Sequence, residues 1–273
     1  MKRSGKMFAF LALAVIATFV SCNKNESELL PVEQKTTTAD YLALFNAFDL
    51  TEEEEITNGD EDALKSAEVS GCLTVIVHEN ETGEFWPRSW TLDYGTENCE
   101  TILGNTRRGK INISLSDYWR NEGSFRQITF EDYYFNDNKL EGTKTVANNG
   151  ENENGNLTFT KKVVNGKLTN TDGTFISWEC EKLSEMIAGQ ETLLYADDVW
   201  SVTGSGNGVN IDGNTYSFKI VNPLIYQNGC FYPVSGSVEI TTGTSVQVID
   251  YGDGTCDNSA TSIVDGVSTV IEL

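Results

Sequence analysis

The stretch DYGDGTCDN, Asp250 to Asn258, combines three carboxylates, two glycines and a cysteine in nine residues. This composition is typical of a calcium loop, because Ca²⁺ binds carboxylate oxygens. The carboxylates that would bind the ion are Asp250, Asp253 and Asp257. Their spacing does not follow the D-x-D-x-D-G pattern of an EF-hand loop. We therefore favour a strand corner fastened by a disulfide and keep calcium as the alternative hypothesis; no other cofactor is expected.

A related stretch, DYGTENCE, occupies Asp93 to Glu100. The similarity extends over residues 71–115 and 229–273, which both begin with Gly-Cys and carry a second cysteine just after the Asp-Tyr-Gly. Each segment has the pattern strand, turn, strand, turn, strand. The sequence therefore predicts two related three-stranded units with the middle of the chain inserted between them.

The repeat also suggests how the cysteines pair. It nominates a disulfide between Cys72 and Cys99 and another between Cys230 and Cys256. Cross-links of such short loops stabilise a fold by roughly 3–4 kcal/mol. Cys180 lies on the same predicted strand face as Trp178, so we expect a buried thiol that packs as a small hydrophobe.

Residues 71–273 read as one all-β domain. Short runs rich in β-branched and aromatic residues alternate with Gly, Asn and Asp, which predicts about twelve strands. Asn165-Gly166, Asp212-Gly213 and Asp265-Gly266 match type I′ hairpin turns. Only EKLSEMIAG, residues 181–189, has the pattern of a helical turn. We predict an antiparallel meander that forms a sandwich or an incomplete barrel.

FWPRSW, residues 85–90, is the most evident ligand-binding pattern. Trp86, Arg88 and Trp90 alternate along one strand face, an arrangement suited to stacking on a sugar ring or an aromatic ligand. The same face continues into Tyr94, so packing in the core is the competing interpretation, and the one we favour.

Catalytic patterns are sparse. His78 is the only histidine, and the chain has neither a zinc triad nor a G-x-S-x-G nucleophile motif. GSGNG, residues 204–208, resembles a phosphate loop but precedes strand pattern, so it lacks the helix that such loops use. The basic cluster NTRRGK, residues 105–110, is expected to pair with carboxylates across strands. We assign no catalytic residue, although a carboxylate pair of the glycosidase kind remains an alternative.

The chain opens with MKRSGKMFAFLALAVIATFVSC, in which a basic start precedes a short apolar run. This pattern predicts a signal peptide over residues 1–21. The small residue before Cys22 resembles the lipobox of bacterial lipoproteins. That resemblance implies that Cys22 becomes the acylated N-terminus, and several acyl chains would anchor the protein firmly in a membrane.

Residues 22–70 form an acidic tether in which short helices are predicted. Tyr41, Phe45 and Phe48 have near-helical spacing, which favours a short helix packed against the edge of the domain. Thr51 and Glu54 match a capping box of a second helix. The whole chain has a net charge of −22. Such a surface repels nucleic acids and anionic lipid headgroups, so neither is expected as a partner.

The lipobox, the acidic tether and the paired DYG…C units together resemble uncharacterised β-rich lipoproteins of the Bacteroidota. The resemblance implies a lipid-anchored protein of the outer membrane, either periplasmic or surface-exposed. Its partners are expected to be the membrane, through the N-terminal lipid, and a glycan or another envelope protein. We expect a non-catalytic binding or structural role. A glycan-active enzyme and a lipid carrier are the alternatives.

Overall fold

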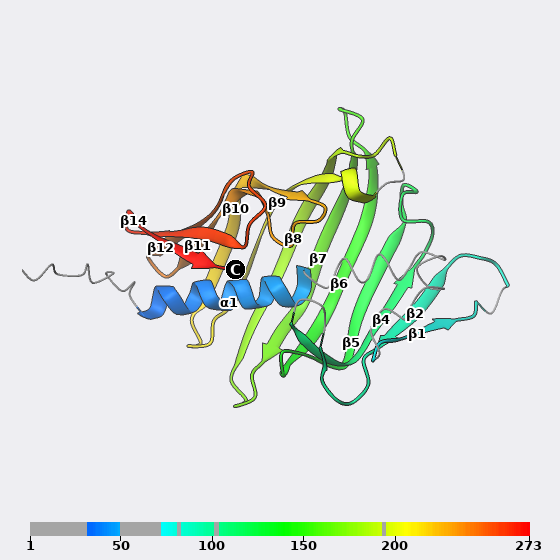
Figure 1. Cartoon of the computed structure of the whole chain (residues 1–273), viewed down its shortest axis with the longest axis horizontal. Helices are drawn as coiled ribbons and strands as arrows, with labels where there is room; N and C mark the ends of the chain where they lie inside the picture. Colours follow the sequence, from blue (N-terminus) through cyan, green and yellow to red (C-terminus); the bar gives the residue numbers. More distant parts are fainter. Residues whose placement is uncertain (1–31, 50–71, 81–82, 101–103, 193–194) are drawn as a thin grey trace, which may run out of the picture.

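The computed structural model describes residues 32–49, 72–80, 83–100, 104–192 and 195–273 (Figure 1). The predicted signal peptide, Cys22 and the predicted second helix at Thr51 lie outside these residues. The described chain contains the α-helix α1 (Val32–Asp49) and the 3₁₀ helix η1 (Tyr195–Asp197). Its strands are β1 (Thr74–His78), β2 (Arg88–Asp93), β3 (Cys99–Glu100), β4 (Thr106–Leu115), β5 (Phe125–Phe135), β6 (Asn138–Glu151), β7 (Leu157–Thr169), β8 (Phe175–Ala188), β9 (Val199–Val209), β10 (Thr215–Gln227), β11 (Ser235–Thr242), β12 (Ser245–Asp253), β13 (Ser259–Val264) and β14 (Val267–Glu272).

The strands form one antiparallel sheet in the order β1, β2, β4 and then β5 to β14, while β3 pairs with β4 beside this path. Neighbours along the chain are therefore neighbours in the sheet. Antiparallel neighbours need only short connections, which agrees with the frequent Gly, Asn and Asp between the strands. The predicted all-β antiparallel meander is confirmed. Within the described chain the sheet is open, with β1 and β14 at its two ends.

The three predicted turns have different outcomes. Asp212 and Gly213 do connect β9 to β10, but only Gly213 has a positive φ, so this turn is not of type I′. Asp265 and Gly266 connect β13 to β14 with φ angles of 49° and 80°, as a type I′ turn requires. The turn predicted at Asn165-Gly166 is wrong, because these residues lie inside β7 where its pairing with β8 changes register. Asn165 has a φ of 54° there. A β-bulge uses the same left-handed backbone conformation as a tight turn, so the dipeptide alone does not separate the two.

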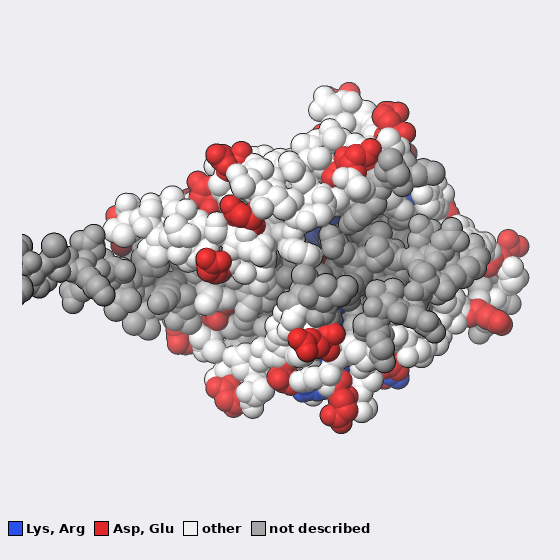
Figure 2. Space-filling view, viewed as in Figure 1, with Lys and Arg blue, Asp and Glu red and all other residues white. Residues whose placement is uncertain are grey.

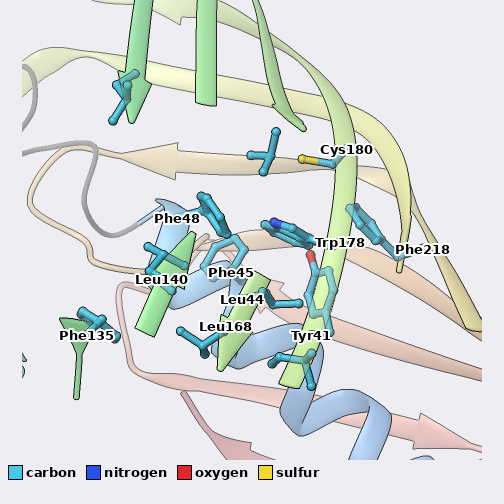
Figure 3. Close-up of a cluster of buried hydrophobic side chains, with 14 of the residues drawn as sticks. Tyr41, Leu44, Phe45, Phe48, Phe135, Leu140, Leu168, Trp178, Cys180 and Phe218 are labelled. Atoms are coloured by element: carbon cyan, nitrogen blue, oxygen red, sulfur yellow. The ribbon is translucent and has the colours of Figure 1, made fainter. Parts of the chain in front are cut away.

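Helix α1 lies across the inner, concave face of the sheet and not at its edge as the sequence suggested (Figure 1). Tyr41, Phe45 and Phe48 follow the i, i+4, i+7 spacing of one helix face, and all three are fully buried. The ring of Tyr41 lies 5.1 Å from that of Phe218, and the ring of Phe48 lies 5.8 Å from that of Trp178 (Figure 3). The helix is therefore the centre of the hydrophobic core.

Lysines from the sheet hold the C-terminal end of α1. Lys144 Nζ donates a hydrogen bond to the carbonyl oxygen of Phe48 at 2.8 Å. Lys182 Nζ lies 2.5 Å from Asp49 Oδ2. The last carbonyls of a helix have no partner within it and carry partial negative charge, so cations are favourable there. Both lysines are buried, and these contacts explain how they are tolerated in the core.

Polar contacts also hold the preceding half of the helix. Asp40 Oδ2 accepts a hydrogen bond from the backbone N–H of Ile211 at 2.7 Å. Burial raises the pKa of the Asp40 carboxyl, and this hydrogen bond partly opposes the rise. Asn210 Nδ2 donates to Thr37 Oγ1 at 3.1 Å. Polar contacts in both halves of α1 thus fix the position of the helix on the sheet.

The glycines of GSGNG make room for the core and do not bind phosphate through a helix. Gly206 and Gly208 on β9 pair with Phe218 and Tyr216 on β10. A Cβ atom on Gly206 would lie 2.5 Å from Cε1 of Phe218 and 2.3 Å from the carbonyl oxygen of Glu179. Since real side chains do not approach so closely, these positions need glycine to let the ring lie flat against the strand.

The helical turn predicted over residues 181–189 is wrong, because residues up to Ala188 belong to β8. Lys182, Ser184 and Met186 are buried, while Leu183 and Ile187 are exposed. Polar residues thus occupy part of the inner face, and apolar residues part of the outer face. This reversal hides the two-residue period that would identify a strand.

We predict that Phe48→Ala lowers the free energy of unfolding by about 3–5 kcal/mol, because it removes a buried aromatic ring and leaves a cavity. Urea unfolding followed by tryptophan fluorescence measures the change. Ala39→Ser, on an exposed position of α1, is the matched control and should change stability little. Equal, small effects of the two substitutions would contradict a core position for α1.

Candidate functional site

Only part of the predicted Trp86–Arg88–Trp90 face is available to a ligand. Trp90 is 2 % exposed and belongs to the hydrophobic core, together with its neighbour Leu92. Trp90 therefore packs in the core, which is the interpretation that we favoured. It is not available as a binding residue. Trp86 precedes β2 and is half-buried, and Arg88 is half-buried at the start of that strand.

These two half-buried residues contact the exposed Phe85, and we call the three residues the edge cluster (Phe85, Trp86 and Arg88). Phe85 is 54 % exposed. Its ring meets that of Trp86 edge to face with 5.1 Å between centroids. The guanidinium carbon of Arg88 lies 4.6 Å from the Phe85 centroid and 6.0 Å from that of Trp86. An exposed aromatic ring held by a cation in this way can stack against a planar or ring-shaped ligand.

The two Asp-Tyr-Gly corners have the same local geometry. In residues 93–95 and 250–252 the aspartate Oδ1 accepts a hydrogen bond from the glycine N–H two residues later, at 2.9 Å in both corners. The side chains of Tyr94 and Tyr251 are buried. An aspartate that binds the backbone two residues further on stabilises a turn, so this motif shapes the chain.

Both predicted disulfides are present, Cys72–Cys99 and Cys230–Cys256. Cys180 has a free, buried thiol, as expected. Burial raises the pKa of this thiol, so the reactive thiolate is disfavoured.

The segments differ beyond the disulfide. After the first corner the chain forms the short strand β3 and then β4, which pairs directly with β2. Gly109 lies within β4. After the second corner it forms β13 and then β14, and Gly266 lies in the hairpin between them. The shared geometry thus covers the corner and its cross-link.

The three candidate calcium ligands accept hydrogen bonds within their own turns. Asp250, Asp253 and Asp257 each accept a hydrogen bond from the residue two positions later, at 2.9, 3.2 and 3.0 Å. They line a shallow depression of about 110 Å³. Within the described residues, no three carboxylate, histidine or cysteine side chains lie close enough together to hold a metal. The structure does not assemble the calcium site.

The basic cluster is largely paired. Arg107 is buried in the inner face of the sheet. Arg108 Nη1 lies 2.5 Å from Asp137 Oδ1, and Lys110 Nζ lies 3.8 Å from Asp93 Oδ2. The predicted pairing with carboxylates is confirmed for these two residues. His78 also has a structural partner, since its Nε2 lies 2.9 Å from Thr91 Oγ1.

A second aromatic surface was not predicted. The rings of Trp119, Phe159 and Trp200 form a continuous series, which we call the aromatic row, with 5.8 Å between the first two centroids and 5.6 Å between the last two. Phe159 is buried, and both tryptophans are half-buried. Arg120 lies 4.8 Å over the Trp119 ring, and Lys161 Nζ lies 6.0 Å from the Trp200 centroid.

The aromatic row combines residues from distant parts of the chain. Trp119 is in the connection between β4 and β5, Phe159 is on β7 and Trp200 is on β9. Sequence reasoning grouped only tryptophans that are adjacent along one strand. The available signal was weak: Trp119 is next to Arg120, and Trp200 follows a pair of aspartates.

One buried carboxyl is close to this surface. Asp198 precedes Trp200 by two residues, and its Oδ1 has no hydrogen-bond partner in the described chain. Burial raises the pKa of the Asp198 carboxyl, and the nearby Arg120 opposes that rise. A carboxyl with a raised pKa can hold a proton, but glycosidase chemistry also requires a second carboxyl across the substrate.

Comparisons with protein families, curated proteins and solved structures find no match to this chain. Within the described residues, no helix combines the length and the apolar character that crossing a membrane requires. Functional inference therefore depends on the chemistry of the chain's own surfaces.

We predict that replacing both Cys230 and Cys256 by serine lowers the free energy of unfolding by about 3 kcal/mol, because the unfolded chain loses its cross-link. Denaturant unfolding of the two proteins measures this difference. A reductant should lower the stability of the native chain further than that of the variant. An identical response of both proteins to reductant would contradict a stabilising role of this disulfide.

Proposed function

We propose that this protein is a lipid-anchored, non-catalytic binding protein of the outer membrane, of the Bacteroidota lipoprotein type, and that it binds a glycan. The observation that carries the binding role is the edge cluster, in which Phe85 is exposed to solvent while Arg88 holds its ring. Large apolar rings kept at a surface are typical of interaction sites. The leader sequence and Cys22 support the anchor.

The chemistry of the edge cluster favours a sugar over a compact ion. Phe85 and Trp86 offer ring surface, and the stem and guanidinium of Arg88 lie against it. The C–H groups of a pyranose can pack on such rings, and the guanidinium can donate hydrogen bonds to hydroxyl groups.

Two further observations favour binding over the alternatives. Asp250, Asp253 and Asp257, the acidic cluster of the second corner, each accept a hydrogen bond within their own turns, which favours a structural role for this cluster. The inner face that a lipid carrier would use is filled by α1 over β8 and β10, where Tyr41 packs on Trp178 and Phe218. A lipid would have to displace the helix there.

The binding role predicts that Phe85→Ala abolishes measurable glycan binding, because it removes the exposed ring. A glycan array and then calorimetry, on the chain from Asn23 to Leu273, measure the effect. Phe175→Ala is the matched control, since Phe175 is an exposed phenylalanine that also has a cation, Lys167, 4.6 Å over its ring. Equal binding by the native chain and Phe85→Ala would refute the edge cluster as the site.

The anchor predicts that Cys22→Ser releases the protein from the membrane fraction, because the acyl chains have no attachment site. Cell fractionation and metabolic labelling with palmitate in a Bacteroidota host measure this. The Cys180→Ser variant should remain in the membrane fraction and keep its label. Labelling of the Cys22→Ser variant would contradict acylation at this residue.

A further inference from the structure

Arg88 has unusual partners for a cation in so acidic a chain. The chain contains 41 Asp and Glu residues against 19 Lys and Arg. Acidic side chains are spread over the face seen in Figure 2, with few Lys or Arg atoms among them. Arg108 and Lys162 each lie within ion-pair distance of a carboxylate. The Arg88 side chain has no ion pair or hydrogen bond within the described residues, where its guanidinium contacts the rings of Phe85 and Trp86.

The ring contact leaves the hydrogen-bonding capacity of the guanidinium for another partner. Its central carbon lies over the Phe85 ring, 4.6 Å from the centroid. A guanidinium has five N–H donors that point along its own plane, so a group that lies over a ring keeps these donors for other acceptors. The two oxygen atoms of a carboxylate match a pair of these donors.

We propose that the glycan bound by the edge cluster is acidic, and that Arg88 selects it by binding a carboxylate of the sugar, as in a uronic acid. This inference rests on the binding role proposed above and names the class of its ligand. Phe85 and Trp86 supply ring surface for the pyranose, and Arg88 supplies a charge-assisted pair of hydrogen bonds that a neutral sugar does not receive.

The edge cluster is held in place by the fold. The backbone of Arg88 pairs with that of Leu115 at the start of β2. Trp86 packs against the hydrophobic core. Asn80 Nδ2 donates a hydrogen bond to the carbonyl oxygen of Pro87 at 3.1 Å, which ties the end of β1 to the chain between Trp86 and Arg88. A site that is already ordered loses less conformational freedom when it binds a ligand.

A second cation–ring pair in the chain serves as a matched control. Lys167 Nζ lies 4.6 Å over the ring of the exposed Phe175. Within the described residues, Lys167 also has no carboxylate partner, and Phe175 has no second ring beside it. A lysine is a point charge without the planar fork of arginine. This pair therefore has an unpaired cation but lacks the second ring and the fork that the proposal requires.

Calorimetry on the chain from Asn23 to Leu273 tests the proposal with two matched probes, trigalacturonic acid and its fully methyl-esterified form. The ester keeps the sugar rings and removes the charges. At physiological ionic strength, charges more than about 8 Å away are largely screened, which limits repulsion of the acid by the rest of the surface. We expect the native chain to bind the acid at least tenfold more tightly than the ester.

Substitutions at Arg88 should remove this preference. Arg88→Gln should lower the affinity for the acid about tenfold, the effect of a lost charge-assisted contact, and change the affinity for the ester little. Arg88→Lys keeps the charge but loses the planar fork, so its preference for the acid should be intermediate. Lys167→Gln should leave both affinities unchanged.

The outcomes separate this inference from the binding role itself. Phe85→Ala should lose binding of both probes. Equal affinity of the native chain for acid and ester, while Phe85→Ala still loses binding, would overturn the acidic ligand and leave the binding role intact. Equal effects of Arg88→Gln and Lys167→Gln, or equal losses of acid and ester in Arg88→Gln, would also overturn it. A folded native chain that binds no glycan at all would refute both; melting temperatures verify folding.

Discussion

The packing of α1 against the inner face of the sheet is the interaction on which the rest of the structure depends. A single open sheet has no second sheet to cover its apolar face, and an antiparallel sheet of this kind is stable only when one face is buried. Tyr41, Phe45 and Phe48 cover the rings of Trp178 and Phe218, so the helix replaces the missing layer. Its position far before the strands in sequence means that the core closes only through long-range contacts.

Covering the sheet with one narrow helix also explains the composition of the inner face. Where α1 lies close to the sheet, β9 has glycines in place of side chains, and the aromatic rings of β8 and β10 fill the space. Where α1 ends, Lys144 and Lys182 satisfy its last carbonyl and carboxylate. Beyond that end, polar and aromatic side chains continue along the inner face. A gradient from helix-covered core to mixed surface thus runs across the strands.

The sequence was informative where structure is determined locally. The disulfide partners and the Asp265-Gly266 turn depend on residues close in the chain, and all were predicted correctly. The second half of β8, after Cys180, was missed because buried Lys182 and Ser184 reverse its hydropathy. Lys182 is buried there because it binds Asp49 at the distant end of α1. Trp90 and Trp86 look equivalent in the sequence, yet only the pairing of β2 with β4 puts the former into the core. Trp119 and Trp200 are 81 positions apart, so their proximity to a common ring follows from topology and not from any motif.

The charged residues also differ in what they indicate: most carboxylates stabilise local turns, and a few cations lie beside aromatic rings at the surface. Many carboxylates, such as those of Asp93, Asp250 and Asp257, accept hydrogen bonds from their own turns and so stabilise strand corners. Acidic residues are consequently poor indicators of a site in this protein, despite their number. Cations are scarce, and most have an evident structural partner such as Asp137 for Arg108 or Glu181 for Lys162. Arg88 lies over the exposed ring of Phe85, so this cation is the better guide to where the chain meets a ligand.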